Sequence, residues 1–112
     1  MNAAPDAIGY LRKDISGIHQ RWDEIQMRSL AQRLGYNLRK TITFDTHTVH
    51  PVYRLGIVAT RLEVDAVFVP SAAHFDGRIP ADLVAIADVI TVSPEATYAR
   101  WGNGELPELN GV

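Results

Sequence analysis

Apolar residues in this chain fall into short continuous runs and longer periodic stretches, and the two patterns alternate along the sequence. The clearest run spans residues 64–71, where β-branched and aromatic side chains follow one another almost without polar interruption. Because a strand covered on both faces needs no polar alternation, this run predicts a central parallel strand. Shorter runs at residues 7–11 and 88–92 predict two further strands. Partial alternation over residues 37–44 predicts a fourth strand, nearer the edge of the sheet.

Helical periodicity is clearest over residues 19–34, just after a predicted loop at residues 15–18. The apolar positions that recur at helical spacing are Trp22, Ile25, Leu30, Ala31 and Leu34. Gly35 follows where a left-handed C-terminal cap is expected. This pattern predicts one amphipathic helix, and both tryptophans of the chain, Trp22 and Trp101, are interpreted as core or interface anchors.

Three further helices are predicted between and after the strands. Pro51 suits the first turn of a helix over residues 51–62, because its missing N–H is not needed there. A short apolar helix follows over residues 80–87. A Ser-Pro-Glu start predicts a last helix over residues 93–101. The composition of residues 102–112, mainly Gly, Pro, Asn and Glu, predicts a disordered tail.

Strands and helices therefore alternate from one end of the pattern to the other. Such an order implies a parallel sheet with right-handed crossovers. The expected fold class is α/β, a three-layer α/β/α domain over residues 1–101 with a mainly parallel, four-stranded sheet. A length of 112 residues, with 46% hydrophobic and 21% charged side chains, fits one ordinary globular domain. Functional groups are expected where the strands end, at the carboxyl edge of the sheet.

The net charge of the chain and its distribution narrow the classes of partner that the protein could bind. The formal net charge is -2, so no bulk basicity indicates a nucleic acid or an anionic membrane. Residues 1–40, however, hold seven Lys or Arg and four Asp or Glu, a local +3, which leaves -5 on the remainder. The cations near the first helix are Arg21, Arg28, Arg33, Arg39 and Lys40. Without exposed aromatic side chains between them, a solvated helix face is the favoured interpretation.

Several classes of site and location are excluded or disfavoured. The chain has no cysteine, which excludes disulfides, thiolate catalysis and cysteine-ligated zinc or iron–sulfur sites. No apolar run approaches the roughly 18 residues of a membrane span, and the first residues lead into no signal-peptide core. We therefore expect a cytoplasmic protein with no cofactor and no membrane partner.

The order of these motifs resembles a known family. The run Ala-Ile-Gly-Tyr-Leu-Arg at residues 7–12 and the helix that follows are similar to the opening of the serine recombinase (resolvase/invertase) catalytic domain. The helix positions that carry the similarity are Gln26, Leu30, Ala31, Gly35 and Tyr36. Residues 65–69 fall where that family has the strand leading into its second catalytic motif. The resemblance covers residues 6–100 in order and spacing, and it implies a resolvase-like fold.

The catalytic motifs of that family are altered here. Its first motif is Tyr, any residue, Arg, an apolar residue and the nucleophilic Ser. Tyr10 and Arg12 fit, but Lys13 replaces the apolar residue and Asp14 stands at the position of the nucleophile. Its second motif is Asp-Arg-Leu, then Gly or Ser, then Arg, and the arginines gather the scissile phosphate. Residues 73–77, Ala-His-Phe-Asp-Gly, occupy that register, so the first acid and both arginines are absent.

These losses favour a protein that does not catalyse recombination. Phosphoryl transfer needs an activated oxygen nucleophile and several cations around the phosphorus, and removing one such donor costs about 2.7–4 kcal/mol. The interpretation that we favour is a catalytically inactive recombinase-like domain, a binding or regulatory module that forms a homodimer or docks on a protein partner. One form of this buries Tyr98 and Trp101 against a second subunit. The residues expected to take part in binding are Arg12, Lys13, Asp45, His74 and Asp76.

Two alternatives stay open. In a phosphoryl or phosphodiester enzyme, Arg12 would grip phosphate while Asp14, Asp45 and His74 supply nucleophile, base or metal ligand. The candidate catalytic residues are then Arg12, Asp14 and Ser16, although Ser16 is interpreted as a loop or helix-capping residue. In the second alternative, a DNA-associated accessory protein uses the basic first helix, and its binding weakens steeply with salt.

Two weaker candidate sites complete the pattern. His47, His50 and His74, with Asp45 and Asp76, have the chemistry of a zinc site, but their spacing matches no ligand motif, so no metal is expected. Ser71 follows a strand without the Gly-x-Ser-x-Gly elbow of a nucleophilic serine.

Overall fold

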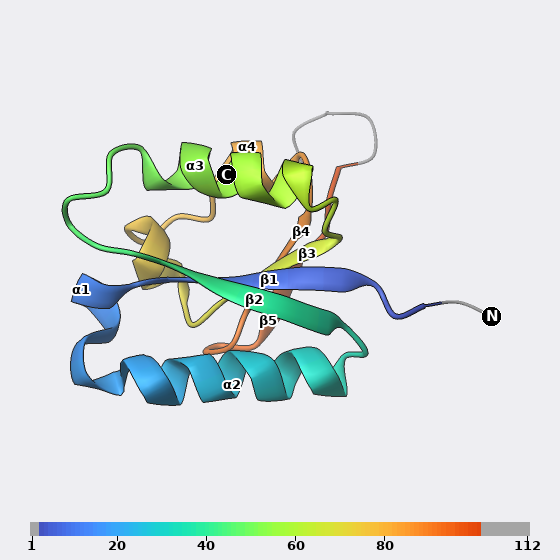
Figure 1. Cartoon of the computed structure of the whole chain (residues 1–112), viewed down its shortest axis with the longest axis horizontal. Helices are drawn as coiled ribbons and strands as arrows, with labels where there is room; N and C mark the ends of the chain where they lie inside the picture. The colour runs from blue at the N-terminus through green and yellow to red at the C-terminus, as the bar shows by residue number, and fades with distance from the viewer. Residues whose placement is uncertain (1–2, 102–112) are drawn as a thin grey trace.

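A five-stranded sheet forms the middle layer of the computed structural model, which describes residues 3–101 (Figure 1). The strands are β1 (Asp6–Arg12), β2 (Asn37–Phe44), β3 (Ala66–Val69), β4 (Asp88–Thr91) and β5 (Ala96–Tyr98). Their order across the sheet is β2-β1-β3-β4-β5. Neighbouring strands are parallel except β5, which runs antiparallel to β4. The predicted α/β class is confirmed, with β3 at the centre and β2 at an edge.

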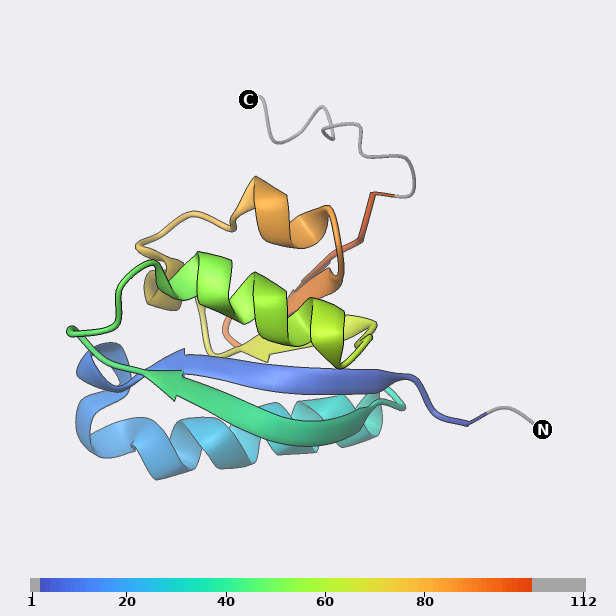
Figure 2. The ribbon, with the colours of Figure 1, turned by 45° about the horizontal axis from the view of Figure 1, so that its top comes forward.

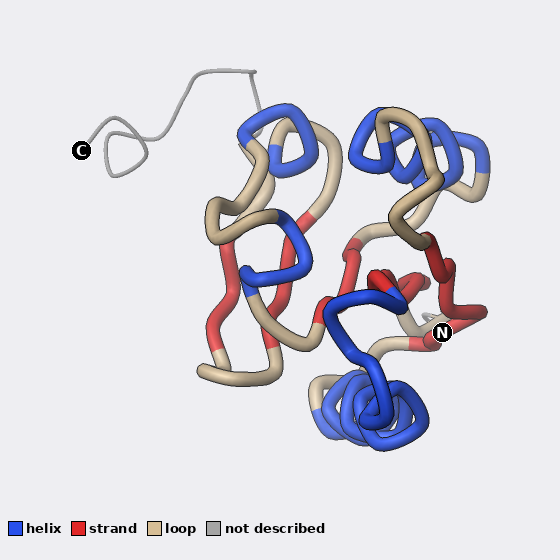
Figure 3. The backbone as a smooth tube through the Cα atoms, turned by 90° about the vertical axis from the view of Figure 1, so that its left-hand side faces the viewer, coloured by secondary structure: helices blue, strands red, loops and turns tan. Residues whose placement is uncertain are grey.

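Helices cover both faces of this sheet. The longest, α2 (Gln20–Arg33), lies on one face, while α3 (Pro51–Arg61) and α4 (Ala81–Val84) lie on the other (Figures 1 and 2). Viewed along the layers, the three-layer order is plain (Figure 3). The short elements are α1 (Lys13–Ser16) and the 3₁₀ turns η1 (Gly17–His19) and η2 (Ala72–Phe75). Within residues 3–101, no helix is long and apolar enough to cross a membrane.

The hydrophobic core is split by the sheet into two clusters, because successive strand residues point to opposite faces. Along β1, Ile8 and Tyr10 join the cluster under α3 and α4, whereas Ala7 and Leu11 join the cluster under α2. Every residue of β3 is buried. Burial on both faces is the reason that β3 reads as an uninterrupted apolar run.

The last predicted helix is wrong. Residues 96–98 form β5, whose Ala96 pairs with Thr91 and whose Tyr98 pairs with Val89, so the sheet has five strands rather than four. A Ser-Pro-Glu sequence suits a tight turn as well as a helix start. Here the Thr91 hydroxyl donates to the Pro94 carbonyl across that turn, and the chain folds back onto β4.

Two smaller differences concern the ends of helices. Residues 15–18, expected as a loop, belong to α1 and η1, which lead directly into α2. The helix expected over residues 80–87 is the single turn of α4. The predicted cap at Gly35 is confirmed, because Gly35 has a φ of +85°, a conformation in which a side chain would be strained. The predicted tail at residues 102–112 lies outside the described residues.

Candidate functional site

Arg12, the last residue of β1, lies between two carboxylates. Its Nε and Nη2 donate to the two oxygens of Asp14 at 3.3 and 2.7 Å, and its Nη1 donates to Asp76 at 2.8 Å. The hydrogen bond from Arg12 lowers the pKa of Asp14, and the bonds to Asp14 and then Asp76 raise the pKa of Arg12. Such charge-assisted, two-pronged pairs are among the stronger hydrogen bonds of proteins. The three side chains together carry a formal charge of -1.

His74 ties the turn η2 to the end of β1. Its side chain is buried, with 3% exposure, and its Nδ1 accepts a hydrogen bond from the backbone N–H of Arg12 at 3.0 Å. Burial lowers the pKa of His74. An Nδ1 that accepts a hydrogen bond carries no proton, so the imidazole here is neutral. In this position His74 acts as an acceptor for the backbone.

Tyr10 contacts the same turn, η2, through its hydroxyl and its ring. Its hydroxyl donates to the carbonyl of His74 at 3.1 Å, and its ring stacks on Phe75 with 5.0 Å between the ring centroids. Burial raises the pKa of Tyr10 to about 12. The phenol is therefore protonated at neutral pH and serves as a hydrogen-bond donor.

Ser16 lies on α1, and its hydroxyl bonds to a residue of α2. Ser16 is buried, and its Oγ donates to Asp23 Oδ2 at 2.6 Å, a hydrogen bond that links α1 to α2. The negative charge of Asp23 also acts on His74, where it opposes the fall in pKa. Sequence analysis did not single out Asp23. No periodic signal connects Asp23 with Ser16, because the helical path breaks between them at Gly17, whose φ is +55°.

We call Tyr10, Arg12, Asp14, Ser16, Asp23, His74 and Asp76 the polar cluster. They lie where β1 and β3 end, the edge expected to carry chemistry. Asp45 belongs to another interaction: it accepts hydrogen bonds from the backbone N–H of His47 at 2.9 Å and the hydroxyl of Thr48 at 3.4 Å. Within residues 3–101, no three His, Asp or Glu side chains are placed to hold a metal ion.

Lys13 and Ser71 occupy positions with simple local roles. Lys13 is exposed at the start of α1. The Ser71 hydroxyl accepts a hydrogen bond from the backbone N–H of Ala73 at 3.2 Å and so caps η2.

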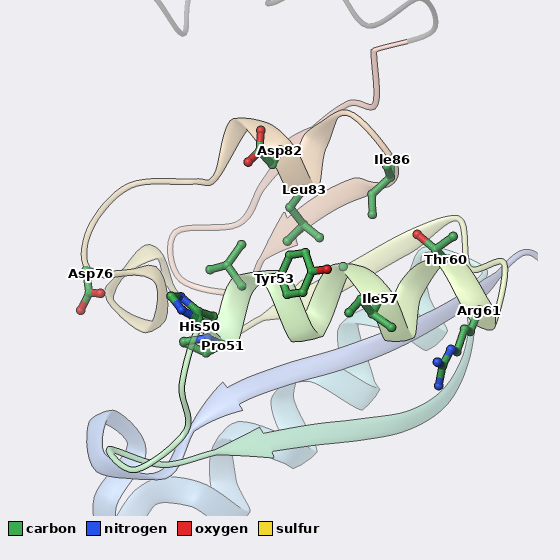
Figure 4. Close-up of a pocket in the computed structure, with 12 residues that line it drawn as sticks. His50, Pro51, Tyr53, Ile57, Thr60, Arg61, Asp76, Asp82, Leu83 and Ile86 are labelled. Atoms are coloured by element: carbon green, nitrogen blue, oxygen red, sulfur yellow. The ribbon is translucent and has the colours of Figure 1, made fainter.

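An apolar groove of about 760 Å³ lies between α3 and α4, next to the polar cluster (Figure 4). Ile57, Leu83 and Ile86 line it, and Asp76 and His50 stand at the end opposite Arg61. Asp76 is shared between the groove and the polar cluster, where its carboxylate accepts from Arg12. The volume of the groove is in the range of ligand pockets. The carboxylate of Asp76, which the groove shares with the polar cluster, is already paired with Arg12.

Tyr98 and Trp101, expected at a subunit interface, are partly buried against the core cluster under α3 and α4. The backbone N–H of Trp101 donates to the Val84 carbonyl at 3.2 Å. Large apolar side chains are more exposed along α1, η1 and α2. We call these residues the apolar stripe: Ile15 (41% exposed), Ile18 (95%), Trp22 (59%) and Ile25 (49%).

The apolar stripe changes the interpretation of the first helix. Leu30 and Ala31 are buried against the sheet as the periodicity predicts, and Met27 joins them. Trp22 and Ile25 are exposed on α2, and Ile25 also lines a groove beside β2, so Trp22 is not a core residue.

Comparison with models of known protein families and with curated proteins finds no match to this chain. The similarity to serine recombinases therefore rests on the residues quoted from the sequence.

Proposed function

We propose that this chain is a non-catalytic, recombinase-like domain that serves as a protein-binding module and associates with a second copy of itself. The observation that carries the first half of this proposal is the pairing of Arg12 with both Asp14 and Asp76. Arg12 is the cation that would have to hold a phosphate in an enzyme built on this edge of the sheet. Its guanidinium is instead occupied by two carboxylates of the same chain.

The electrostatics of the polar cluster support the same conclusion. Asp14 stands where a nucleophile would be needed, and its lowered pKa keeps it ionised, so it repels a phosphate. His74 is neutral and uses Nδ1 to accept from the backbone, and the Ser16 hydroxyl donates to Asp23. Transition-state stabilisation of phosphoryl transfer relies on cations aimed at the developing charge. Here the charged groups satisfy one another and hold β1, α1 and η2 together.

The apolar stripe supplies the surface for the second half of the proposal. Ile18, Trp22 and Ile25 recur at intervals of four and three residues, the spacing that places side chains on one side of a helical segment. A contiguous exposed apolar face that includes a tryptophan is typical of a protein interface. A second copy offers the same face, and a two-fold axis pairs such a face with itself.

Sedimentation velocity over a range of protein concentrations tests self-association. We expect the wild-type chain to form dimers and the Ile18→Asp variant to remain monomeric, because the new carboxylate lies in the middle of the paired faces. Val49→Asp is the matched control, since Val49 is another exposed β-branched residue outside the stripe. A wild-type chain that stays monomeric at every soluble concentration, or an equal effect of both variants, contradicts the proposal.

A phosphodiesterase assay tests the absence of catalysis. With a nitrophenyl phosphodiester as substrate, we expect the wild-type chain and Asp14→Asn to give the same background rate. Hydrolysis by the wild-type chain that Asp14→Asn abolishes would establish the enzyme alternative instead.

A further inference from the structure

A groove between the flank of α2 and the edge strand β2 is lined mainly by cations. Its volume is about 540 Å³, and the residues that line it are Arg21, Glu24, Ile25, Arg28, Arg39, Lys40 and Thr41. We call it the basic groove. Four cations and one carboxylate give its lining a formal charge of +3, whereas the whole chain carries -2. Positive charge is therefore concentrated here against the overall sign of the molecule.

A β-bulge in β2 builds one wall of the basic groove. Two residues of β2, Arg39 and Lys40, stand opposite the single residue Ile8 of β1, because the register of the two strands shifts there. Consecutive residues of a regular strand point to opposite faces of the sheet, whereas a bulge changes the direction of its side chains. The bulge therefore explains how three consecutive residues, 39–41, line the same groove.

The cations of the basic groove are less neutralised than the guanidinium of the polar cluster. Arg39 lies 3.9 Å from an oxygen of Asp6, and the side chains of this loose pair are both exposed to solvent. Among the ion pairs of residues 3–101, none involves Arg21, Arg28 or Lys40. All three of these residues are exposed, so their charges are accessible to an anionic partner.

We propose that the basic groove binds an acidic polypeptide segment, which adds in an extended form to the outer edge of β2. Within residues 3–101, β2 has a neighbouring strand, β1, on one side only. An edge strand presents a row of backbone N–H and C=O groups on its outer side, and an extended segment can pair with them. The main-chain hydrogen bonds supply affinity, and the side chains supply selectivity.

The geometry of an added strand places acidic side chains against the cations. Side chains of an extended segment alternate between the two faces of the sheet, so acidic residues at every second position would all point toward α2. Arg21 and Arg28 stand seven residues apart on α2, about 10 Å along the helix at about 1.5 Å per residue. A segment of about five residues, at about 3.3 Å per residue, is long enough to reach both arginines. Arginine also pairs well with carboxylates, through two parallel hydrogen bonds.

The lining of the basic groove favours a polypeptide over a nucleic acid. None of the described residues that line it is aromatic, so the groove offers no platform on which a base could stack, and its one large apolar side chain is Ile25. The residues outside the groove carry a net charge of -5, which would repel a long polyanion that extends beyond it. A short acidic segment paired with β2 stays within the positive region.

A simpler explanation accounts for only part of the groove. Charged residues, lysine above all, and β-bulges are common on edge strands because they discourage pairing with another sheet. That role explains Arg39 and Lys40 on β2. Their repulsion acts against a second copy of β2 and not against an acidic segment, so it also contributes to selectivity. Protection of the edge does not account for Arg21 and Arg28, which lie on a helix.

Fluorescence anisotropy with a labelled peptide of about ten residues, in which glutamate and threonine alternate, tests this inference. We expect binding at low salt that weakens as salt screens the charges. The Arg28→Glu, Lys40→Glu double variant replaces one cation on each wall by a charge of the same sign as the peptide, so it is expected to bind at least about tenfold more weakly. Both side chains are exposed, so the variant is expected to fold, which circular dichroism checks.

The matched control is the Arg61→Glu, Arg78→Glu double variant, which makes the same change in net charge at exposed residues outside the basic groove. It is expected to bind the peptide like the wild-type chain. Equal weakening by both double variants, or no binding of the peptide at low salt, overturns the inference. Displacement of the peptide by an oligothymidylate of matched charge as readily as by unlabelled peptide also overturns it, in favour of polyanions in general.

Hydrogen exchange tests the addition of a strand to β2. Pairing with the outer edge is expected to slow the exchange of backbone amides within residues 37–44, which mass spectrometry of the peptide-bound chain measures. Methylation of alternate backbone nitrogens of the peptide removes donors without changing its charge, so the methylated peptide is expected to bind more weakly. Unchanged exchange over β2, together with equal binding of the methylated peptide, overturns the inference.

The inference goes beyond the proposed self-association and does not depend on it, although Ile25 belongs to both the apolar stripe and the basic groove. Ile18 does not line the groove, so Ile18→Asp is expected to bind the acidic peptide like the wild-type chain. A wild-type chain that forms dimers and binds no acidic peptide overturns only this inference. A wild-type chain that stays monomeric and binds the peptide overturns only the self-association.

Discussion

His74 shows at the scale of one residue how a group that looks catalytic can be fully used by the fold. Its ring nitrogen accepts from the backbone of β1 and its carbonyl accepts from Tyr10, two contacts that join segments more than 60 positions apart in the sequence. A histidine in a loop after a strand reads as a ligand or a base when only the sequence is considered. Burial and a neutral, accepting Nδ1 give it a structural role instead.

Replacing the acceptor of His74 tests that role. His74→Leu leaves the partly buried backbone N–H of Arg12 without this partner, and an unpaired buried group costs about 1–3 kcal/mol of unfolding free energy, an upper range for this position. His74→Asn places an oxygen near the position of Nδ1 and is expected to lose less. Urea unfolding at mildly alkaline pH measures both. Equal stability of the two variants would show that this hydrogen bond contributes little.

The titration of His74 predicts a pH dependence of stability. Burial lowers its pKa, so as the pH falls below about 6.5 the unfolded chain takes up a proton that the native chain does not. The unfolding free energy is therefore expected to decrease as the pH falls through this range and to level off above it. Urea midpoints for His74→Asn should show a smaller slope there. His47→Asn, in an exposed loop, is the control and should keep the wild-type slope.

At the scale of elements, the parts of the fold that the sequence predicted are those whose burial is uniform. β3 is buried on both faces and therefore reads as a continuous apolar run, and Gly35 marks the end of α2 because its backbone needs a positive φ. β5 was missed because three residues carry no period and Ser-Pro-Glu is compatible with both a turn and a helix start. α2 has two apolar faces at the same spacing, so periodicity alone could not assign Trp22 to the outer one.

The polar cluster was predictable only in part for a related reason. Residues that follow β1 and β3 are expected to meet, since neighbouring parallel strands end at one edge of the sheet, and the structure brings Arg12 and Asp76 together there. Asp45 follows β2 at the same edge, yet it bonds to its own loop. Which carboxylate reaches Arg12 depends on the local turn, and turn geometry has no periodic signature.

Close packing of β2 and α2 around β1 predicts the effect of a change at Gly9. A Cβ at Gly9 would lie 2.9 Å from the Thr41 Oγ1 and 3.4 Å from the Met27 Cε, so Gly9→Ala forces a neighbour to move. Overpacking of this kind costs about 1–3 kcal/mol. Thr41→Ala removes the nearest atom, and the double variant is expected to recover part of the loss in a double-mutant cycle.

Gly56→Ala is the control for this prediction. A Cβ at Gly56 would make an ordinary contact, 3.8 Å from the Ile86 Cδ1, inside α3. The gain in helix propensity is up to about 1 kcal/mol, so the variant is expected to be as stable as the wild-type chain or more stable. Thermal or urea unfolding measures the four variants and the wild-type chain. A Gly9→Ala variant without loss, or a double variant no more stable than Gly9→Ala, would show that Thr41 does not limit the packing.

At the scale of the whole molecule, the paired charges lie at one edge of the sheet, whereas the exposed apolar and cationic side chains lie along the helical layer of α2. The carboxyl edge of β1 and β3 holds charges that pair with one another. The apolar stripe lies along α1, η1 and α2, and of the cations on the flank of α2 toward β2 only Arg39 has an ion pair among residues 3–101. One helix thus packs on the sheet through Met27, Leu30 and Ala31 and leaves exposed surface on its other sides, where Ile25 belongs both to the apolar stripe and to the groove beside β2. This arrangement favours binding through the α2 layer over chemistry at the strand ends.

Self-association through the apolar stripe predicts that thermal stability depends on protein concentration. A native dimer that unfolds to monomers is stabilised by mass action, so the Tm of the wild-type chain is expected to rise with concentration. Ile18→Asp should abolish this dependence without lowering the Tm of the dilute protein, because Ile18 is almost fully exposed and surface changes usually stay within about 0.5 kcal/mol. Val49→Asp should retain the dependence. Differential scanning calorimetry over a wide concentration range gives the answer, and a wild-type Tm that does not change with concentration would rule out a dimer that is stabilised through this face.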